Sequence, residues 1–260
     1  MGKKSKVIGI VPARMAASRF PGKPLHSILG RPMLEHVFLR AAMYEGWDTL
    51  VLATCDAEIE AFAKGKGFPV VMTGSHHTRA LDRVAEAAQK LGEPVDDDDI
   101  VVCVQGDEPM MRPDMIDAVM APLLENAPIP ATILAMHIVD KDLWLNPDTV
   151  KLVYNASGEV LYTSRAPVPY CKGAFGAEHE ARRIYGIFAF RWKYLKAFTE
   201  HPETRLEKLE TCDSNRILDM TFRQYIAPYP SIPSFSVDSP ADIGLVERHL
   251  ISDEYWARYK

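Results

Sequence analysis

The sequence lacks the features that mark membrane and nucleic-acid-binding proteins. No apolar run in its 260 residues reaches the roughly 18 residues that a membrane-spanning helix needs. The net charge is −5, which argues against a general nucleic-acid binder. The charged stretch at the start leads directly into an apolar strand pattern, without the form of a cleavable signal peptide. We therefore expect a cytoplasmic protein with no membrane and no nucleic-acid partner.

Cysteine is scarce as well. Cys55, Cys103, Cys171 and Cys212 are scattered along the chain without a CxxC motif. This pattern predicts reduced, mostly packed thiols and argues against a cysteine zinc site. The two histidines at 76–77 are interpreted as helix-cap and surface residues, because the sequence shows no third ligand at metal spacing.

Strand-like runs alternate with helical patterns through the first half of the chain, and no internal repeat is present. The strands are predicted at 6–11, 49–55, 68–74 and 100–107, and the helices at 32–46, 57–67, 80–92 and 113–126. Strands separated by helices of this length predict an α/β fold, with a mostly parallel twisted sheet and helices on both faces. Ligands of such Rossmann-like sheets bind at the carboxyl ends of the strands.

From about residue 130 the pattern changes to strand-like runs with short links. These runs are TILAMHIV, TVKLVYN, VLYTSRAPVP and YGIFAFRW, and they predict antiparallel strands inserted in the sheet or extending it. A helix at 205–219, a strand at 222–228 and a tail helix at 240–251 follow. We expect one domain over residues 1–260, with an inserted subregion at about 150–220.

The segment Val11–Leu25 carries three cations directly after the first strand. Arg14, Arg19 and Lys23 lie in a stretch that is too rich in small residues and proline to form a stable helix. Arginine forks and a lysine point charge suit the oxygens of a triphosphate. No GxxxxGK[ST] motif is present, so the segment is not a P-loop. A solvated basic loop is the alternative interpretation.

Two acidic residues occupy positions that suit a hard divalent cation. Asp107, in QGDEP, follows the predicted central strand, and Asp238, in SVDSP, opens the tail helix. Alternatively, Asp107 caps a turn, and an acid or serine before proline is a common helix start. The two acids form a metal pair only if the fold brings them together.

These segments, with NPDTVKLV (146–153) and LYTSRAPVP (161–169), resemble the cytidylyltransferases that activate 3-deoxy-D-manno-octulosonate (Kdo), the CMP-Kdo synthetases. The resemblance runs from residue 7 to about 250. It implies a nucleotidyltransferase that joins CMP from CTP to the anomeric hydroxyl of an acidic 3-deoxy keto sugar and releases pyrophosphate. The nucleotide sugar would serve surface polysaccharide or lipopolysaccharide biosynthesis. The resemblance also implies Mg²⁺ and a homodimer built through the 150–220 region.

The resemblance assigns roles to individual residues. Arg14, Arg19 and Lys23 match the loop that holds the CTP phosphates, and Asp107 and Asp238 match the two acids that hold a catalytic Mg²⁺. The residues assigned to catalysis are thus Arg14, Lys23, Asp107 and Asp238. Gln105 matches a substrate-contacting position, and Arg165 matches the residue that engages the sugar acid. From these matches and the segments around them, we predict that the substrate-binding residues are Arg19, Arg79, Arg83, Gln105, Arg165, Tyr185, Glu210 and Asp213.

Three segments depart from the Kdo enzymes. Residues 77–83 read HTRALDR where those enzymes carry Ser-Gly-Thr before an acid and Arg, Ile184 replaces a histidine, and Cys212-Asp213-Ser214 replaces Leu-Glu-Gln. We interpret these as changes on the acceptor side, where Arg79 suits a more anionic group, or else as neutral drift. Plain Kdo is then not expected to be the best substrate. The alternatives are a nucleotidyltransferase for a nonulosonic acid or a sugar phosphate, and a non-catalytic nucleotide-binding paralogue.

Overall fold

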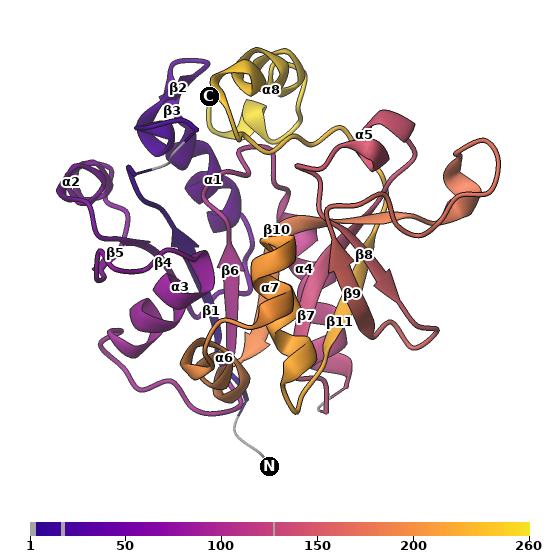
Figure 1. Cartoon of the computed structure of the whole chain (residues 1–260). Helices are drawn as coiled ribbons and strands as arrows, with labels where there is room; N and C mark the ends of the chain where they lie inside the picture. Colours follow the sequence, from indigo (N-terminus) through magenta and orange to yellow (C-terminus); the bar gives the residue numbers. More distant parts are fainter. Residues whose placement is uncertain (1–3, 17–18, 127) are drawn as a thin grey trace. The chain divides into compact units, whose positions relative to one another are not determined.

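A computed structural model describes residues 4–16, 19–126 and 128–260, which divide into two units (Figure 1). Unit 1 comprises the chain up to Ile116 together with Pro233–Lys260, and unit 2 comprises Asp117–Ile232. The subregion expected at about 150–220 lies wholly within unit 2. Residues 17 and 18 of the segment Val11–Leu25, called the cationic loop below, lie outside the described residues.

Unit 1 contains the parallel sheet that the alternating pattern predicts. Its strands are β1 (Val7–Pro12), β4 (Thr49–Thr54), β5 (Val70–Met72) and β6 (Ile100–Val104), in the order β6-β1-β4-β5. Every pair is parallel. All six residues of β1 are buried, because the sheet is covered on both faces.

Three crossover helices connect these strands. They are α1 (Met33–Ala42), α2 (Ala57–Gly65) and α3 (Ala80–Gln89), and α3 packs against β1, β4 and β6 (Figure 1). The chain moves from β1 through β4 to β5 and then returns past β1 to β6. Right-handed crossovers therefore place α1 and α2 on one face and α3 on the other. The division between the units falls within α4 (Pro113–Glu125).

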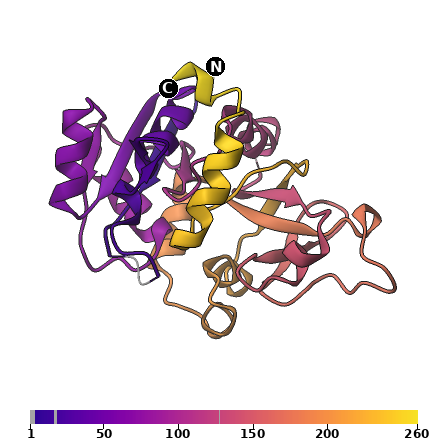
Figure 2. The same ribbon diagram turned by 90° about the horizontal axis from the view of Figure 1, so that it is seen from above.

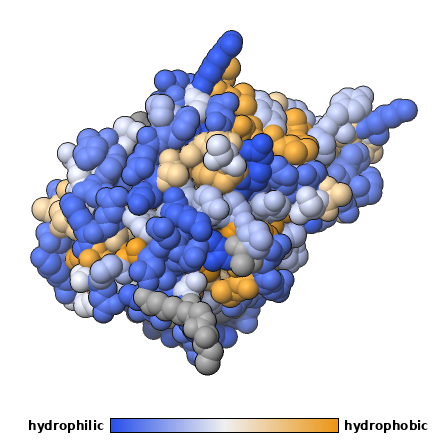
Figure 3. Space-filling view, turned by 90° about the horizontal axis from the view of Figure 1, so that it is seen from below, coloured by the Kyte–Doolittle hydropathy of each residue, from blue (hydrophilic) through white to orange (hydrophobic). Residues whose placement is uncertain are grey.

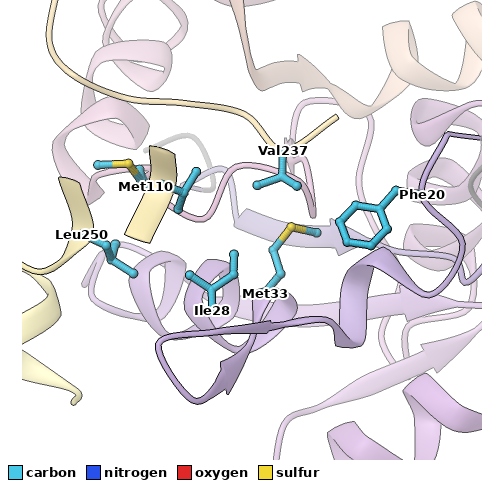
Figure 4. Packing of buried hydrophobic residues seen from close by; sticks show 7 residues of the cluster. Phe20, Ile28, Met33, Met110, Val237 and Leu250 are labelled. Carbon is cyan, nitrogen blue, oxygen red and sulfur yellow. The ribbon is translucent and has the colours of Figure 1, made fainter. Parts of the chain in front are cut away.

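An apolar cluster joins the cationic loop to the end of the chain in unit 1. It contains Phe20, Ile28, Met33, Met110, Val237, Val246 and Leu250, and Met33 lies beside Phe20 and Val237 (Figure 4). The tail, predicted as one helix over 240–251, forms a 3-10 turn at Pro240–Asp242 and then α8 (Ile243–Leu250). Helix α8 packs against β2 (Ser27–Ile28), which pairs with β3 (Arg31–Pro32) in a hairpin that the sequence did not predict (Figures 1 and 2).

Unit 2 holds the predicted antiparallel strands. Strands β7 (Ala131–His137) and β10 (Arg182–Arg191) are antiparallel, as are β8 (Lys151–Tyr154) with β10 and β8 with β9 (Val160–Ser164). In contrast, β11 (Gln224–Tyr229) runs parallel to β7.

The helices of unit 2 differ more from the prediction. The helix expected at 205–219 is divided into α7 (Arg205–Glu210) and a 3-10 segment at Asp213–Asp219, because Thr211 adopts a left-handed backbone with φ 48°. Helices α5 (Lys141–Leu145) and α6 (Trp192–Glu200) and the 3-10 turn at Ala177–His179 were not predicted. Unit 1 likewise has unpredicted 3-10 turns at Lys23–Leu25 and Trp256–Arg258.

The surface seen in Figure 3 is largely hydrophilic, with smaller apolar areas. Within the described part of the chain, every helix is too short or too polar to cross a membrane. All four cysteines are free thiols, and Cys103 and Cys212 are buried.

Candidate functional site

A cavity of about 230 Å³ lies at the carboxyl ends of β1 and β6 in unit 1. Five segments line it: residues 12–14 at the end of β1, Lys23 and Pro24 of the 3-10 turn Lys23–Leu25, Met33 at the start of α1, residues 77–80 with Arg83 around the start of α3, and residues 105–107 after β6. The cavity thus lies where ligands of parallel sheets bind. Of the predicted site residues, Arg14, Lys23, Arg79, Arg83, Gln105 and Asp107 all line it.

Gly106 allows the chain after β6 to pass close to the end of β1. A Cβ atom at this position would lie 2.6 Å from the backbone oxygen of Pro12, a contact that backbone cannot relieve by side-chain rotation. The absence of a side chain at Gly106 therefore sets the distance between the Arg14 and Asp107 sides of the cavity.

Gly106→Ala is expected to lower the free energy of unfolding by about 1–3 kcal/mol, because the new Cβ displaces backbone. Urea denaturation followed by circular dichroism measures this change. Gly92→Ala is the matched control, since a Cβ at Gly92 meets no atom within 4 Å. Equal stability of the two variants would contradict the close approach.

The two predicted metal acids come from neighbouring backbone segments. The backbone N–H of Val237 donates to the backbone oxygen of Asp107 at 2.9 Å, so the segment carrying Asp238 lies beside the end of β6. Lys23 connects the two segments, because its Nζ donates to Asp107 Oδ2 at 3.1 Å and to the oxygen of Val237 at 2.7 Å. Arg19 Nη2 pairs with Asp238 Oδ1 at 2.7 Å. Two of the three predicted phosphate-binding cations, Lys23 and Arg19, are thus ion-paired with the two predicted metal acids.

The start of α3 forms the opposite side of the cavity. The backbone oxygen of His77 accepts hydrogen bonds from Arg14 Nη1 at 3.4 Å and from Arg83 Nη2 at 3.5 Å. Arg83 is buried and also donates to Thr73 and Gly74. Residues 77–83 were assigned to the acceptor side, and the structure places 77–80 and Arg83 in the same cavity as Arg14 and Lys23.

The sequence analysis named Arg79 and Arg83 as substrate-binding residues but did not consider the backbone N–H groups at the start of α3. A helix N-terminus presents free backbone N–H groups that favour anions, and α3 begins at Ala80 on the cavity wall. The signal available in the sequence was the helical pattern that begins at residue 80 after a predicted strand.

The sequence shows no third ligand at metal spacing beside His76 and His77, but the structure brings Glu86 to them. Glu86, on α3, places a carboxylate oxygen so that one ligand atom from each of the three residues lies within 4.8 Å of the others. Partial burial raises the pKa of Glu86, but hydrogen bonds from Lys90, the Gly74 N–H and His77 outweigh it and lower the pKa to about 2. Glu86 is therefore ionised at neutral pH.

Arg165 lies after β9 in unit 2, held by oxygens of two neighbouring segments. Its Nη1 donates to the oxygen of Pro147 at 2.9 Å, and its Nε donates to the oxygen of Glu210 at 3.1 Å. These carbonyl acceptors orient the guanidinium without neutralising its charge. The Glu210 carboxylate accepts from the Arg165 N–H at 2.9 Å and from the hydroxyls of Tyr162 and Ser164.

Hydrogen bonding determines the charge state of Glu210. Burial raises its pKa, but the bonds from Tyr162, the Arg165 N–H and Ser164 together lower it. Glu210 is thus an ionised carboxylate, and it positions Arg165 by accepting the hydrogen bond from its backbone N–H.

The other predicted substrate residues of unit 2 lie in different surroundings. Tyr185 is fully buried on β10, with the Arg183 guanidinium 5.3 Å from its ring centre. Asp213 is half-buried at the start of the 3-10 segment Asp213–Asp219. Their roles in substrate binding stay predictions.

Lys151, on β8, is fully buried beneath Arg165. Its Nζ donates to the backbone oxygens of Asn146, Thr149 and Arg165 at 2.6–2.8 Å. Burial disfavours the charged ammonium and the Arg165 guanidinium repels it, which together lower the pKa of Lys151 to about 8.

The low pKa of Lys151 makes the stability of the fold depend on pH in a defined window. Its ordinary pKa is 10.5, so between pH 8 and 10.5 the unfolded chain binds more protons than the folded one. The free energy of unfolding is therefore expected to rise with pH in this window, by at most about 3 kcal/mol. Urea denaturation of the native protein and of Lys151→Met measures it. The difference between their unfolding free energies should stay constant below pH 8 and grow above it, and a constant difference throughout would contradict the prediction.

Comparison with known proteins defines the class. Residues 8–223 match the family model described as cytidylyltransferase. The 3-deoxy-manno-octulosonate cytidylyltransferase of Nitratidesulfovibrio vulgaris (strain Hildenborough) is 42% identical over 240 residues, which cover 92% of this chain and 93% of the relative. The protein of that name from Aliivibrio fischeri (strain ES114) is 37% identical over 246 residues, covering 93% and 97%. The chain belongs to the cytidylyltransferase family, among the 3-deoxy-manno-octulosonate cytidylyltransferases.

Solved structures agree with this assignment. The structure of CMP:2-keto-3-deoxy-manno-octonic acid synthetase complexed with CTP is 31% identical with a TM-score of 0.85, covering 95% of this chain and 99% of that one. The 4-diphosphocytidyl-2C-methyl-D-erythritol synthase of Anaerococcus prevotii is 16% identical with a TM-score of 0.62, covering 95% and 96%. At that identity the second structure supports the fold alone.

Proposed function

We propose that the protein is a CTP-dependent cytidylyltransferase that joins CMP to the anomeric hydroxyl of Kdo, or of a closely related acidic 3-deoxy keto sugar, and releases pyrophosphate. The observation that carries the proposal is the cavity at the ends of β1 and β6, where Arg14, Lys23 and Asp107 converge in a chain of this family. A non-catalytic paralogue has no need to keep these two cations and Asp107 in one cavity.

The reaction requires charge stabilisation and alignment more than covalent chemistry from the protein. Arg14 and Lys23 bind the phosphates of CTP and stabilise the departing pyrophosphate. Gln105 lines the same cavity and contacts the substrate there. The start of α3 adds backbone N–H groups that favour the same anionic ligand.

Asp107 and Asp238 fit a magnesium ion by the chemistry of their donors. Both offer carboxylate oxygens, the ligands that Mg²⁺ prefers, and the Val237 N–H to Asp107 oxygen bond of 2.9 Å holds their segments together. Both acids already lie against a cation, Lys23 and Arg19 respectively. When bound, the ion supplies charge neutralisation and lowers the pKa of the attacking hydroxyl.

Arg165 supports an acceptor that carries a carboxylate, because carbonyl contacts hold its guanidinium and leave its charge for an anion. The names of the relatives favour Kdo over a nonulosonic acid or a sugar phosphate. The replacement of the family histidine by Ile184 removes a polar contact, which favours an acceptor substituted relative to plain Kdo.

Pyrophosphate release tests the function directly. The full chain is assayed with CTP, UTP, ATP or GTP and Mg²⁺, against Kdo, an amino-substituted Kdo and a nonulosonic acid. We expect CTP to be preferred and kcat/KM to be highest for a member of the Kdo class. A preference for ATP or GTP would overturn the proposal. So would the finding that none of the acceptors in the panel supports pyrophosphate release. If plain Kdo has the highest kcat/KM, the replacements at Arg79 and Ile184 are neutral.

We also infer a homodimer, a cytoplasmic location and a product used in surface polysaccharide or lipopolysaccharide synthesis, as the family resemblance implies. Unit 2 exposes large apolar side chains that suit an interface, among them Tyr170 (85% exposed) and Leu161 (48%). Light scattering after size exclusion tests the dimer, and Tyr170→Glu should shift it toward the monomer.

A further inference from the structure

Three potential metal ligands meet where the segment after β5 leads into α3, and neither the family resemblance nor the proposed reaction uses them as metal ligands. His76 and His77 follow β5, and Glu86 lies on α3. One ligand atom from each lies within 4.8 Å of the other two. The imidazole rings of His76 and His77 have centres 4.1 Å apart, and His77 Nε2 is hydrogen-bonded to Glu86 Oε2. The histidines therefore approach the carboxylate from one short segment.

Local structure holds this arrangement in place. Both oxygens of Glu86 accept the backbone N–H of Gly74, at 3.1 and 2.9 Å, which ties the histidine segment to α3. Gly74 also leaves room for the His76 ring, because a Cβ at Gly74 would lie 2.4 Å from Cε1 and 2.5 Å from Nδ1 of His76. The glycine thus lets the His76 ring fold back over the chain.

The donor set selects a class of metal. Two imidazole nitrogens and one carboxylate oxygen suit borderline dications such as Zn²⁺, whereas Mg²⁺ prefers oxygen ligands alone. An ion bound here takes the place of the hydrogen bond between His77 and Glu86. His76 is exposed, which leaves a further coordination position open to water.

We propose that His76, His77 and Glu86 form a binding site for a zinc-class transition-metal ion, separate from the Asp107 and Asp238 carboxylates. The site fastens the segment between β5 and α3 to the body of α3. The backbone oxygen of His77 accepts hydrogen bonds from Arg14 and Arg83, so the same segment forms a wall of the nucleotide cavity. His77 itself lines the cavity, so metal bound here stiffens that wall.

Zinc titration of the metal-free full chain tests the proposal, without CTP or acceptor, so its outcome is independent of the proposed enzyme activity. Isothermal titration calorimetry is expected to show one saturable site, and Co²⁺ should give the visible absorption of a tetrahedral complex. His76→Ala and Glu86→Gln should each weaken zinc binding by about tenfold or more. Circular dichroism checks that the variants are folded, and exposed His76 is the safer substitution.

His179→Ala is the matched control, because His179 Nε2 lies 2.8 Å from Cys171 Sγ in unit 2 and offers a competing pair of ligands. Zinc affinity that is unchanged in His179→Ala and lost in His76→Ala supports the site. Zinc binding that His76→Ala and Glu86→Gln leave unchanged, or no saturable binding by the native chain, would overturn it.

Discussion

Asp107→Asn is expected to lower turnover by about two orders of magnitude or more while leaving CTP affinity nearly unchanged. We propose that Asp107 holds the catalytic cation, whose contribution to transition-state stabilisation is several kcal/mol, and each 1.36 kcal/mol corresponds to a factor of ten. Asparagine keeps the shape of the side chain and still accepts a hydrogen bond from Lys23, so the fold should persist. Pyrophosphate release under saturating CTP and Mg²⁺ measures turnover.

Asp238→Asn should behave in the same way, since the backbone contact at Val237 brings its segment to Asp107. Glu58→Gln, an exposed carboxylate on α2, is the control and should be as active as the native protein. Near-normal turnover of Asp107→Asn at saturating Mg²⁺ would remove the metal assignment from this residue.

Lys23→Ala is expected to weaken CTP binding as well as turnover. A charged hydrogen bond to phosphate contributes about 1.5–3 kcal/mol, so the Kd for CTP should rise roughly tenfold or more. We propose that Lys23 contacts the phosphates in both the ground state and the transition state, so kcat/KM should fall further than kcat. Arg14→Ala should show the same pattern. Calorimetric titration with CTP measures the affinity.

Lys64→Ala, which removes an exposed lysine on α2, controls for the change in net charge. Its CTP affinity should match that of the native protein. If Lys23→Ala and Arg14→Ala also keep native affinity, the cationic loop does not bind the nucleotide.

Local patterns were sufficient to predict the sheet of unit 1. Its strands are short buried runs bounded by helices of ordinary length, so periodicity alone separates the elements. Asp107 could be placed at the ligand-binding edge because it follows such a run directly. Helix α6 was missed because no glycine or proline separates β10 from Trp192, and Arg191 at its start makes no side-chain cap. The two-residue strands β2 and β3 are too short to show any period.

The candidate site was predicted where one segment carries the chemistry and missed where two segments must meet. Arg14, Lys23 and Asp107 each stand in a recognisable motif beside a strand. Glu86 lies in an ordinary amphipathic helix, and only the reversal of the chain between β5 and α3 brings it to His76 and His77. The contact of Arg14 with the His77 oxygen depends on the same reversal. No local pattern encodes such long-range contacts.

The ion pairs between Lys23 and Asp107 and between Arg19 and Asp238 mean that the cations and carboxylates of the site are counterions for each other. A triphosphate that arrives alone must draw Lys23 from Asp107 and leave a carboxylate without a partner. A divalent cation that arrives alone takes the Asp107 carboxylate and leaves the Lys23 ammonium without a counterion. When both arrive together, every charge exchanges one partner for another and none is stranded. Nucleotide and metal should therefore bind with positive cooperativity, each tightening the other by the same factor.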